Sequence, residues 1–236
     1  MTMSPFNDSY PQLLSLAVHE LRTPASVVGG YLRMLQRDSD TPLTERQRKM
    51  IDEAEKSCAR LVQLVAELSD VSKLDAGLIT IARQPIDLFD LVGEVAGSVH
   101  EHEDRDVRLE VRGDSSGAPV DGDTTRLRTA FHAIFRAILR EQPAAGVVIA
   151  ERRLDAPGGI SSAVIVVAES THVQAAYSAP AGPFDEKRGG LGLALPIARR
   201  VIEAHGGRIT SPRTPDNDAN STAGRGAAII TLPLRS

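Results

Sequence analysis

The stretch SLAVHELRTP, residues 15–24, places His19 directly before the carboxylate of Glu20. On a helix, residues i, i+3 and i+4 lie on one face, so His19, Arg22 and Thr23 would form one patch with Glu20 beside it. Glu20 can hold the proton on Nδ1 and leave Nε2 as the nucleophile. A lone histidine on a helix is more often a solvated surface residue, but this context favours phosphoryl chemistry at the imidazole.

Apolar residues extend outward from this stretch in a heptad pattern. They step by four and three along two segments, which a turn-forming cluster at 37–42 separates. The first segment carries Leu14, Val18, Leu21, Ala25, Val28, Leu32 and Leu35, and the second carries Ile51, Ala54, Cys58, Leu61, Val65 and Leu68. The pattern predicts two long helices, the second capped by Thr44 and continuing to about Leu74. Pro24 is expected to kink the first helix or to loosen its hydrogen bonding.

Two such helices joined by a short turn form a helical hairpin. One hairpin cannot bury both apolar seams well, whereas two hairpins can bury them in a four-helix bundle. The sequence therefore predicts a homodimer through this region. His19 follows the seam position Val18, so we expect it to point outward beside the core.

The composition is that of an ordinary globular protein with an aliphatic core, since the 236 residues include no tryptophan and 3% aromatics. The formal net charge of −4 gives no argument for a nucleic-acid partner or an anionic membrane. The single cysteine excludes an internal disulfide framework. No apolar run approaches the ~20 residues that span a bilayer, and residues 1–10 look like a tail rather than a signal peptide. We expect a cytoplasmic protein without membrane insertion, which receives any signal through another protein.

After Gly77 the sequence alternates between strand-like and helix-like segments. Strands are predicted at 78–81, 108–111, 147–150, 163–168 and 227–232, and helices at 87–95, 123–139 and 191–205. Such a mixture indicates an α+β sandwich with helices on one face of a sheet.

The block His19-Glu20-Leu21-Arg22-Thr23-Pro24 resembles the H-box of two-component sensor histidine kinases, and residues 67–77 resemble the end of that family's second helix. The resemblance implies that residues 11–77 form a dimerisation and histidine-phosphotransfer domain. It implies that His19 carries a phosphoryl group and that Glu20 is its general base. It also implies that Thr23 orients water when the partner receiver is dephosphorylated, with Arg22 in the same site.

Residues 78–236 resemble the ATP-binding catalytic domain of the same family. Gly189, Gly190 and Gly192 are similar to its last glycine box, and glycines before a helix let backbone amides approach phosphate. Other nucleotide-binding motifs of the family are altered in this sequence. The two asparagine positions fall on Ala133 and Ala137, and the second of these is the family's Mg²⁺ ligand, which an alanine methyl cannot replace.

The remaining nucleotide positions are altered in a similar way. The lysine position is Arg140, the aspartate position that faces adenine is Glu169, and two glycine positions are Thr171 and Val173. The resemblance thus leaves Glu169, Arg140 and the three glycines as nucleotide-binding candidates, with no metal ligand. ATP with Mg²⁺ is not expected as a working cofactor.

We expect a phosphorelay protein in which His19 exchanges a phosphoryl group with the aspartate of a response-regulator receiver, with little or no ATP-dependent autophosphorylation. A divergent but active ATP-dependent kinase is the first alternative. Receiver phosphatase activity through Glu20 and Thr23 is another, and so is a non-enzymatic dimeric scaffold that regulates a partner kinase. The expected partners are a second copy of the chain, a receiver domain and an upstream kinase or sensor.

Overall fold

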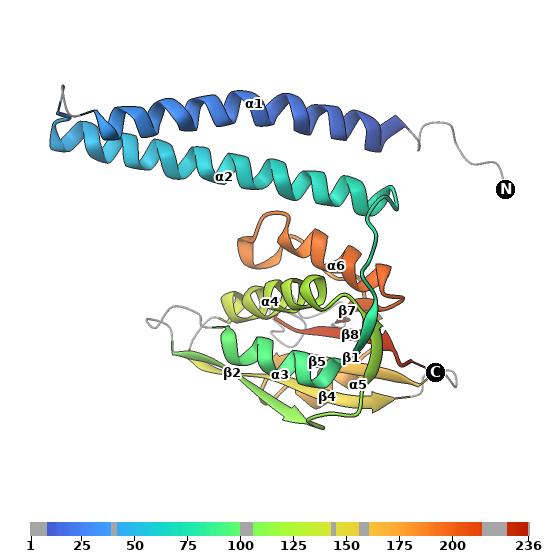
Figure 1. The fold of residues 1–236 in the computed structure, drawn as a ribbon. Coiled ribbons are helices and arrows are strands. Elements are labelled where there is room, and N and C mark those ends of the chain that lie inside the picture. Colours follow the sequence, from blue (N-terminus) through green and yellow to red (C-terminus); the bar gives the residue numbers. More distant parts are fainter. Residues whose placement is uncertain are drawn as a thin grey trace. The chain divides into compact units, whose positions relative to one another are not determined.

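A computed structural model of the protein describes residues 9–38, 42–99, 106–142, 145–155, 161–213 and 226–235. The chain divides into two compact units, residues 1–79 and 80–236 (Figure 1). Residues 1–8 of the predicted tail lie outside the described ranges.

The first unit is the predicted helical hairpin, made of α1 (Ser9–Arg37) and α2 (Glu45–Asp75). Thr44 caps α2 in a capping box: its side-chain oxygen accepts the backbone N–H of Gln47 at 3.3 Å, while Oε1 of Gln47 accepts the backbone N–H of Thr44 at 2.9 Å. Helix α1 continues through Pro24 without a break. Because proline has no N–H, the carbonyl of Glu20 one turn earlier receives no helical hydrogen bond from it.

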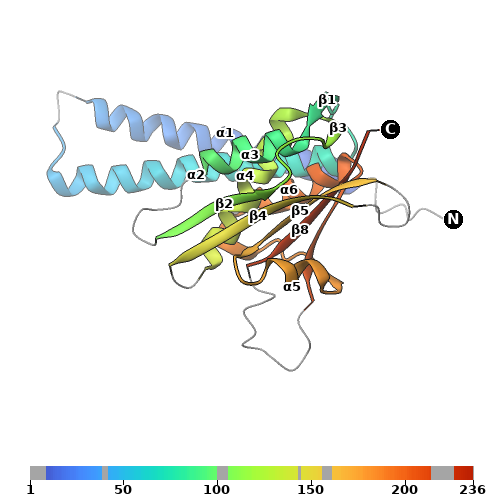
Figure 2. The ribbon, with the colours of Figure 1, turned by 90° about the horizontal axis from the view of Figure 1, so that it is seen from below.

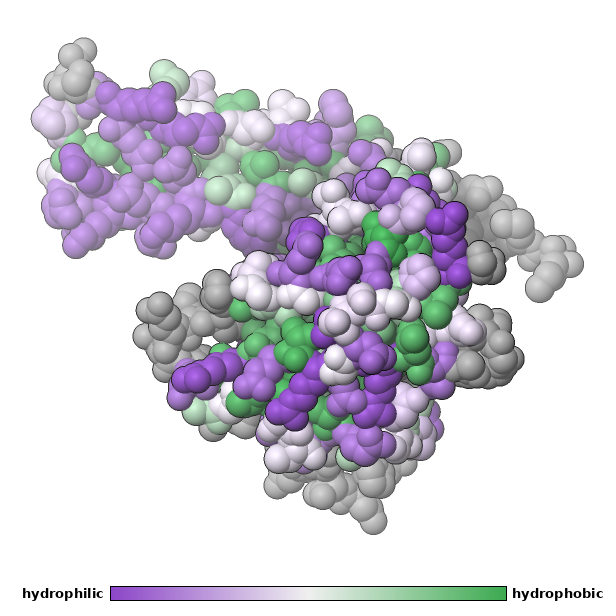
Figure 3. Space-filling view, turned by 60° about the horizontal axis from the view of Figure 1, so that its bottom comes forward, coloured by the Kyte–Doolittle hydropathy of each residue, from purple (hydrophilic) through white to green (hydrophobic). Residues whose placement is uncertain are grey.

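The apolar residues of the heptad seams differ in how deeply they are buried. Val18 on α1 and Cys58 and Val65 on α2 are buried, and the Cys58 thiol donates to the carbonyl of Ala25 at 3.0 Å. Four large seam residues remain about half exposed: the exposed fractions are 52% for Leu21, 52% for Val28, 47% for Leu35 and 56% for Leu61. One hairpin therefore buries only part of its apolar pattern. In Figure 3 the end of the hairpin where the two helices are joined is covered mainly by hydrophilic residues.

In its described residues, the second unit combines a six-stranded sheet with four helices and a short 3-10 helix. The helices are α3 (Leu88–Ser98), α4 (Thr124–Glu141), α5 (Val173–Ser178), η3 (Arg188–Gly190) and α6 (Ala194–Ala204). The strands are β1 (Gln84–Asp87), β2 (Val107–Gly113), β3 (Pro119–Gly122), β4 (Gly146–Asp155), β5 (Ser162–Glu169), β6 (Ala181–Gly182), β7 (Arg208–Pro212) and β8 (Ala228–Pro233). The sheet order is β2-β4-β5-β8-β7-β6, with β2 parallel to β4, and β1 pairs separately with β3.

The predicted strand at 78–81 is wrong, because residues 78–83 form no strand and the first strand begins at Gln84. Its short alternation resembled a strand, but the pairing with β3 starts six residues later. The strands β3, β6 and β7 and the helix α5 were not predicted. The other predicted elements are found at nearly the expected positions.

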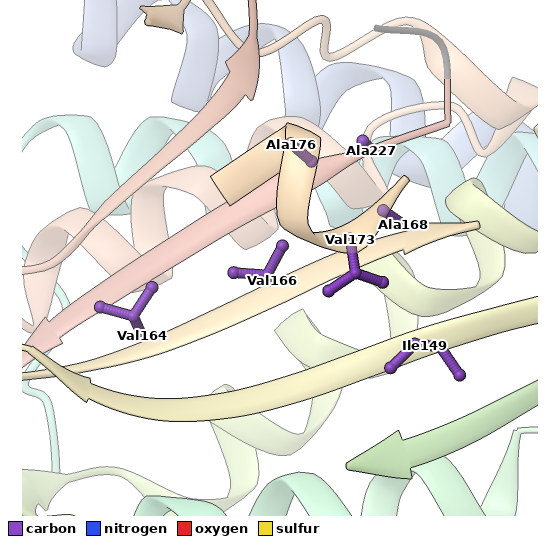
Figure 4. Close-up of a cluster of buried hydrophobic side chains, with 7 residues drawn as sticks. All are labelled: Ile149, Val164, Val166, Ala168, Val173, Ala176 and Ala227. Carbon is purple, nitrogen blue, oxygen red and sulfur yellow. The ribbon is translucent and has the colours of Figure 1, made fainter. Parts of the chain in front are cut away.

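The two faces of the sheet are covered by different helices. On β4, Arg152 points toward α3, where its guanidinium donates to the carbonyl of Phe89 at 3.1 Å. The neighbouring Arg153 points the other way and donates to Gln174 of α5 at 2.9 Å. Figure 4 shows Val173 of α5 facing Ile149 of β4, and the same cluster contains Val166 and Ala168 of β5. Helices therefore lie on both faces of the sheet, α3 and α4 on one and α5 on the other (Figure 2), which corrects the expected single helical layer.

A buried histidine joins the ends of α4 and α6. His205 is 6% exposed; its Nδ1 donates to the carbonyl of Val201 at 2.6 Å, and its Nε2 accepts the backbone N–H of Asp123 at 2.9 Å. Both contacts require the neutral ring with its proton on Nδ1. Burial lowers the pKa of His205, against the opposing effect of its bond to Val201. His205 thus connects the last turn of α6 with Asp123, the N-cap of α4.

Candidate functional site

The first candidate site is the exposed histidine on α1. The side chains of His19 and Glu20 are 78% and 72% exposed, and Nδ1 of His19 lies 3.4 Å from Oε1 of Glu20. Arg22 and Thr23 are exposed as well. A proton on Nδ1 shared with Glu20 leaves Nε2 with a free lone pair, which is the arrangement a nitrogen nucleophile needs.

The seven-residue repeat places this site on one particular flank of the hairpin. Val18 and Ala25 face α2, and His19 and Ser26 each follow one of them by one position. Leu21 and Val28 follow the same two residues by three positions, so they lie on the opposite flank. The hairpin therefore has an apolar flank and a reactive flank that do not overlap.

A groove lies on the reactive flank between α1 and α2. It has a volume of about 300 Å³ and is lined by Ala25, Ser26, Gly29, Arg33, Glu55, Cys58, Ala59 and Val62. Gly29 opens it, because a Cβ there would lie 3.3 Å from the sulfur of Cys58. Ser26 is seven residues beyond His19, which is about 10 Å along a helix. The groove therefore begins within the footprint of any domain that docks over His19.

The second candidate site is the glycine block that precedes α6. The glycines 189, 190 and 192 have φ values of 65°, 60° and 65°, which glycine alone adopts without strain. Arg140 of α4 donates to the carbonyl of Gly189 at 3.3 Å. A Cβ on Gly189 would lie 2.7 Å from the Cα of Ala137, so the block packs directly on α4. The structure brings together three of the positions predicted from the sequence, and it fills the space beside Ala137 with the protein's own backbone.

Arg188, immediately before this block, is a residue that sequence reasoning missed. It is 7% exposed, and its guanidinium donates to the carbonyl of Ala227 at 2.8 Å and to the hydroxyl of Ser211 at 3.0 Å. The sequence signal was an arginine beside a glycine cluster, which in isolation reads as a charged surface residue.

Glu169, the predicted adenine-facing carboxylate, ends β5 and is engaged by its own neighbours. Its oxygens accept the hydroxyl of Ser170 at 2.8 Å, both the hydroxyl and the backbone N–H of Thr171, and Nδ1 of His172 at 2.8 Å. The hydroxyl of Thr171 and these other donors lower the pKa of Glu169 to about 2. Three of these donors converge on Oε2 and one reaches Oε1, so an adenine amino group would share the carboxylate with four donors of the protein.

Neither site offers a metal centre in the described part of the chain. Among the described residues, no group of three or more histidine, cysteine, aspartate and glutamate side chains is placed to hold a metal ion. Within the same ranges, no helix is both long and apolar enough to cross a membrane.

Comparison with known proteins places the first unit in a described family. Residues 12–77 match the family described as "His Kinase A (phospho-acceptor) domain". The sensor protein GacS of Pseudomonas syringae pv. syringae is 28% identical over 219 residues, which cover 86% of this chain and 23% of GacS. The circadian input-output histidine kinase CikA of Synechococcus elongatus is 27% identical, over 94% of this chain and 29% of CikA. The histidine-protein kinase BaeS of Escherichia coli is 27% identical, over 92% of this chain and 45% of BaeS.

Solved structures resemble the whole fold. Full-length ShkA in complex with AMPPNP superposes with a TM-score of 0.63 at 22% identity, covering 95% of this chain and 45% of ShkA. The Acinetobacter baumannii histidine kinase AdeS superposes with a TM-score of 0.52 at 19% identity, covering 92% of this chain and 96% of the AdeS chain. The chain spans less than a third of the length of GacS and of CikA.

Proposed function

We propose that the chain, which belongs to the two-component sensor histidine kinase family, is a phosphorelay protein. His19 accepts a phosphoryl group on Nε2 and exchanges it with the aspartate of a response-regulator receiver. Glu20 holds the proton on Nδ1 and acts as the general base. Little or no phosphoryl group comes from ATP bound to the same chain.

The observation that carries this proposal is the separation of the two flanks of the hairpin. His19 is 78% exposed on a flank of its own, where a receiver can reach Nε2 from solvent. The groove on that flank, with Arg33 and Glu55 in its lining, offers both charges and an apolar floor to a docking surface. A receiver seated there leaves the apolar flank free for another contact.

A second copy of the chain is the partner we propose for the apolar flank. Leu21, Val28, Leu35 and Leu61 are each about half exposed, and together they supply the unpaired seam of a four-helix bundle. Burying this seam in a homodimer leaves His19 of each hairpin accessible. The dimer and the phosphotransfer reaction therefore use different surfaces.

The condition of the glycine block supports the weak use of ATP. Mg²⁺ stabilises the charge that develops on a transferred phosphoryl group, and Ala137 supplies no oxygen to hold the ion. Gly189 packs against Ala137 where such a ligand would extend. Glu169, the position that would face adenine, has its oxygens occupied by neighbouring donors.

A phosphotransfer assay on the full chain tests this function. The purified protein is mixed with a receiver phosphorylated on its aspartate, with and without Mg-ATP, as wild type, as His19→Ala and as His132→Ala. The last variant is a control that removes a histidine of α4 in the second unit. We expect label to pass to the wild type and to His132→Ala without ATP, and not to His19→Ala. Label on His19→Ala would refute the role of His19.

The same assay separates the alternatives. Rapid labelling of the wild type from Mg-ATP alone would identify an active kinase and refute the ATP-independent part of the proposal. Release of inorganic phosphate from the receiver that is lost in Thr23→Ala would identify a phosphatase. Transfer to neither protein, with a dimer still present, would favour the scaffold.

A further inference from the structure

The segment that runs from the end of α5 to the start of α6, residues 179–193, carries a buried cation, Arg188, that contacts the rest of the second unit. We propose that Arg188 is a latch that keeps this segment closed on α4, β7 and the start of β8. A nucleoside triphosphate reaches the glycine block only when the latch is released. This inference rests on the proposed function, since it gives a physical reason for the weak use of ATP.

Arg188 is anchored by groups from three other elements. Its two terminal nitrogens donate to the carbonyl of Ala227, just before β8, and to the hydroxyl of Ser211 on β7. Its Nε lies 3.8 Å from a carboxylate oxygen of Glu141 at the end of α4, and the ring of Phe184 covers the guanidinium at 5.0 Å. An arginine that stayed buried without these partners would leave an uncompensated charge, which is strongly destabilising. The contacts of Arg188 are therefore expected to form or break together.

The rest of the segment is tied down on both sides of Arg188. Before it, β6 pairs with β7, and the carbonyl of Pro180 accepts the backbone N–H of Arg213 at 2.8 Å. After it, Arg140 donates to the carbonyl of Gly189, which packs against Ala137. The carboxylate of Glu186 also pairs with Arg199 on α6. Arg188 lies at the centre of these contacts and is the most deeply buried charged side chain among them.

The closed arrangement has a chemical consequence for anions. The guanidinium of Arg188 faces a carboxylate, a carbonyl and a hydroxyl of the protein, and so it is not presented to a phosphate. An anionic ligand that entered between Gly189 and Ala137 would have to separate them, and the segment that moves carries Arg188 with it. Opening therefore requires that the buried contacts of Arg188 be broken.

Hydrogen exchange and nucleotide titration on the full chain test the latch. The variants are Arg188→Ala, Arg188→Lys and Ser211→Ala, with Arg208→Ala as the matched control, because Arg208 is exposed on the same strand as Ser211. The probe is a fluorescent ATP analogue, titrated with Mg²⁺ and with a chelator. Exchange is measured in peptides that cover residues 181–193 and, for comparison, α3.

We expect Arg188→Ala to speed exchange in residues 181–193 by about tenfold or more, since hydrogen bonds to a charged group are lost. Exchange in α3 and in the Arg208→Ala control stays at the wild-type rate. Arg188→Lys keeps the charge but not the two-pronged donation, so its effect is intermediate. Arg188→Ala binds the ATP analogue more tightly than the wild type does, with or without Mg²⁺.

Unchanged exchange in residues 181–193 of Arg188→Ala overturns the latch, and so does equal nucleotide affinity in that variant and the wild type. If Arg188→Ala does not fold, Ser211→Ala decides: faster exchange confined to residues 181–193 supports the latch, and wild-type exchange overturns it. The receiver assay on His19 does not depend on this outcome, so the latch and the proposed function fail separately.

Discussion

Replacing Leu61 by alanine is expected to weaken the proposed homodimer. Leu61 is 56% exposed within one hairpin, so just over half of its surface remains to be buried by a second copy. Full burial of a leucine stabilises a structure by about 1.5–3 kcal/mol. Just over half of this remains to be gained in the dimer, and an alanine side chain would still gain part of it. The substitution should therefore cost about 1 kcal/mol of association free energy per protomer. A two-fold symmetric dimer contains the change twice, so the dissociation constant of the dimer should rise about 30-fold.

Sedimentation equilibrium of the full chain measures this change, and Leu154→Ala is the matched control. Leu154 is 50% exposed but belongs to β4 in the second unit. Leucine and alanine are both good helix formers, so Leu61→Ala leaves α2 itself intact. Equal dissociation constants for the two variants would refute the assignment of the apolar flank to the dimer.

Two further predictions concern the stability of the second unit. Burial lowers the pKa of His205 from its ordinary value of 6.5. The neutral ring therefore contributes stability that is fully present above pH 6.5 and is lost as the pH falls through the lowered pKa. Urea unfolding between pH 7.5 and 5 should show this loss, and the same pH dependence in His205→Gln would contradict it. Gly207→Ala should destabilise the protein by about 1–3 kcal/mol, because its Cβ would lie 2.5 Å from the carbonyl oxygen of Thr231. By contrast, Gly97→Ala in α3 meets nothing within 4 Å and should stabilise by about 0.5–1 kcal/mol; thermal unfolding that gave both changes the same sign would refute this reading.

Sequence periodicity was sufficient to predict a helix or strand wherever the local apolar pattern agrees with burial in the structure. The apolar face of α4 and the continuous apolar run of β5 are fully buried, and Thr44, Asp87 and Asp123 cap their helices as their side chains favour. The hairpin was predictable for the same reason, since its contacts repeat every seven residues.

The errors occur where distant residues decide the structure. Residues 78–81 have the composition of a strand, but β1 forms at Gln84, where Asp87 accepts the backbone N–H of Gly117 at 2.6 Å, thirty residues away. Burial raises the pKa of Asp87, yet its backbone N–H donors outweigh this effect and hold the pKa below the ordinary value. No local pattern encodes such a contact.

The candidate sites divide in the same way. His19 and Glu20 are neighbours in the chain, so their proximity follows from the sequence. The contacts of Arg188 come from residues 23 and 39 positions away, which a linear motif does not reveal. The sequence predicts Gly189 to be a phosphate-binding glycine, and the structure shows that its missing Cβ also lets the block touch α4.

The division of the hairpin into two flanks has an evolutionary consequence. Under the proposed function, a substitution at Ser26, Arg33 or Ala59 would change the surface offered to a docking receiver and would leave the seam that contains Leu61 unaltered. A duplicated copy of the gene could thus acquire a new signalling partner by drift on one flank while it continued to assemble through the other. Conversely, changes at Leu21 or Val28 would stop two duplicated copies from mixing without redirecting either one to a new partner.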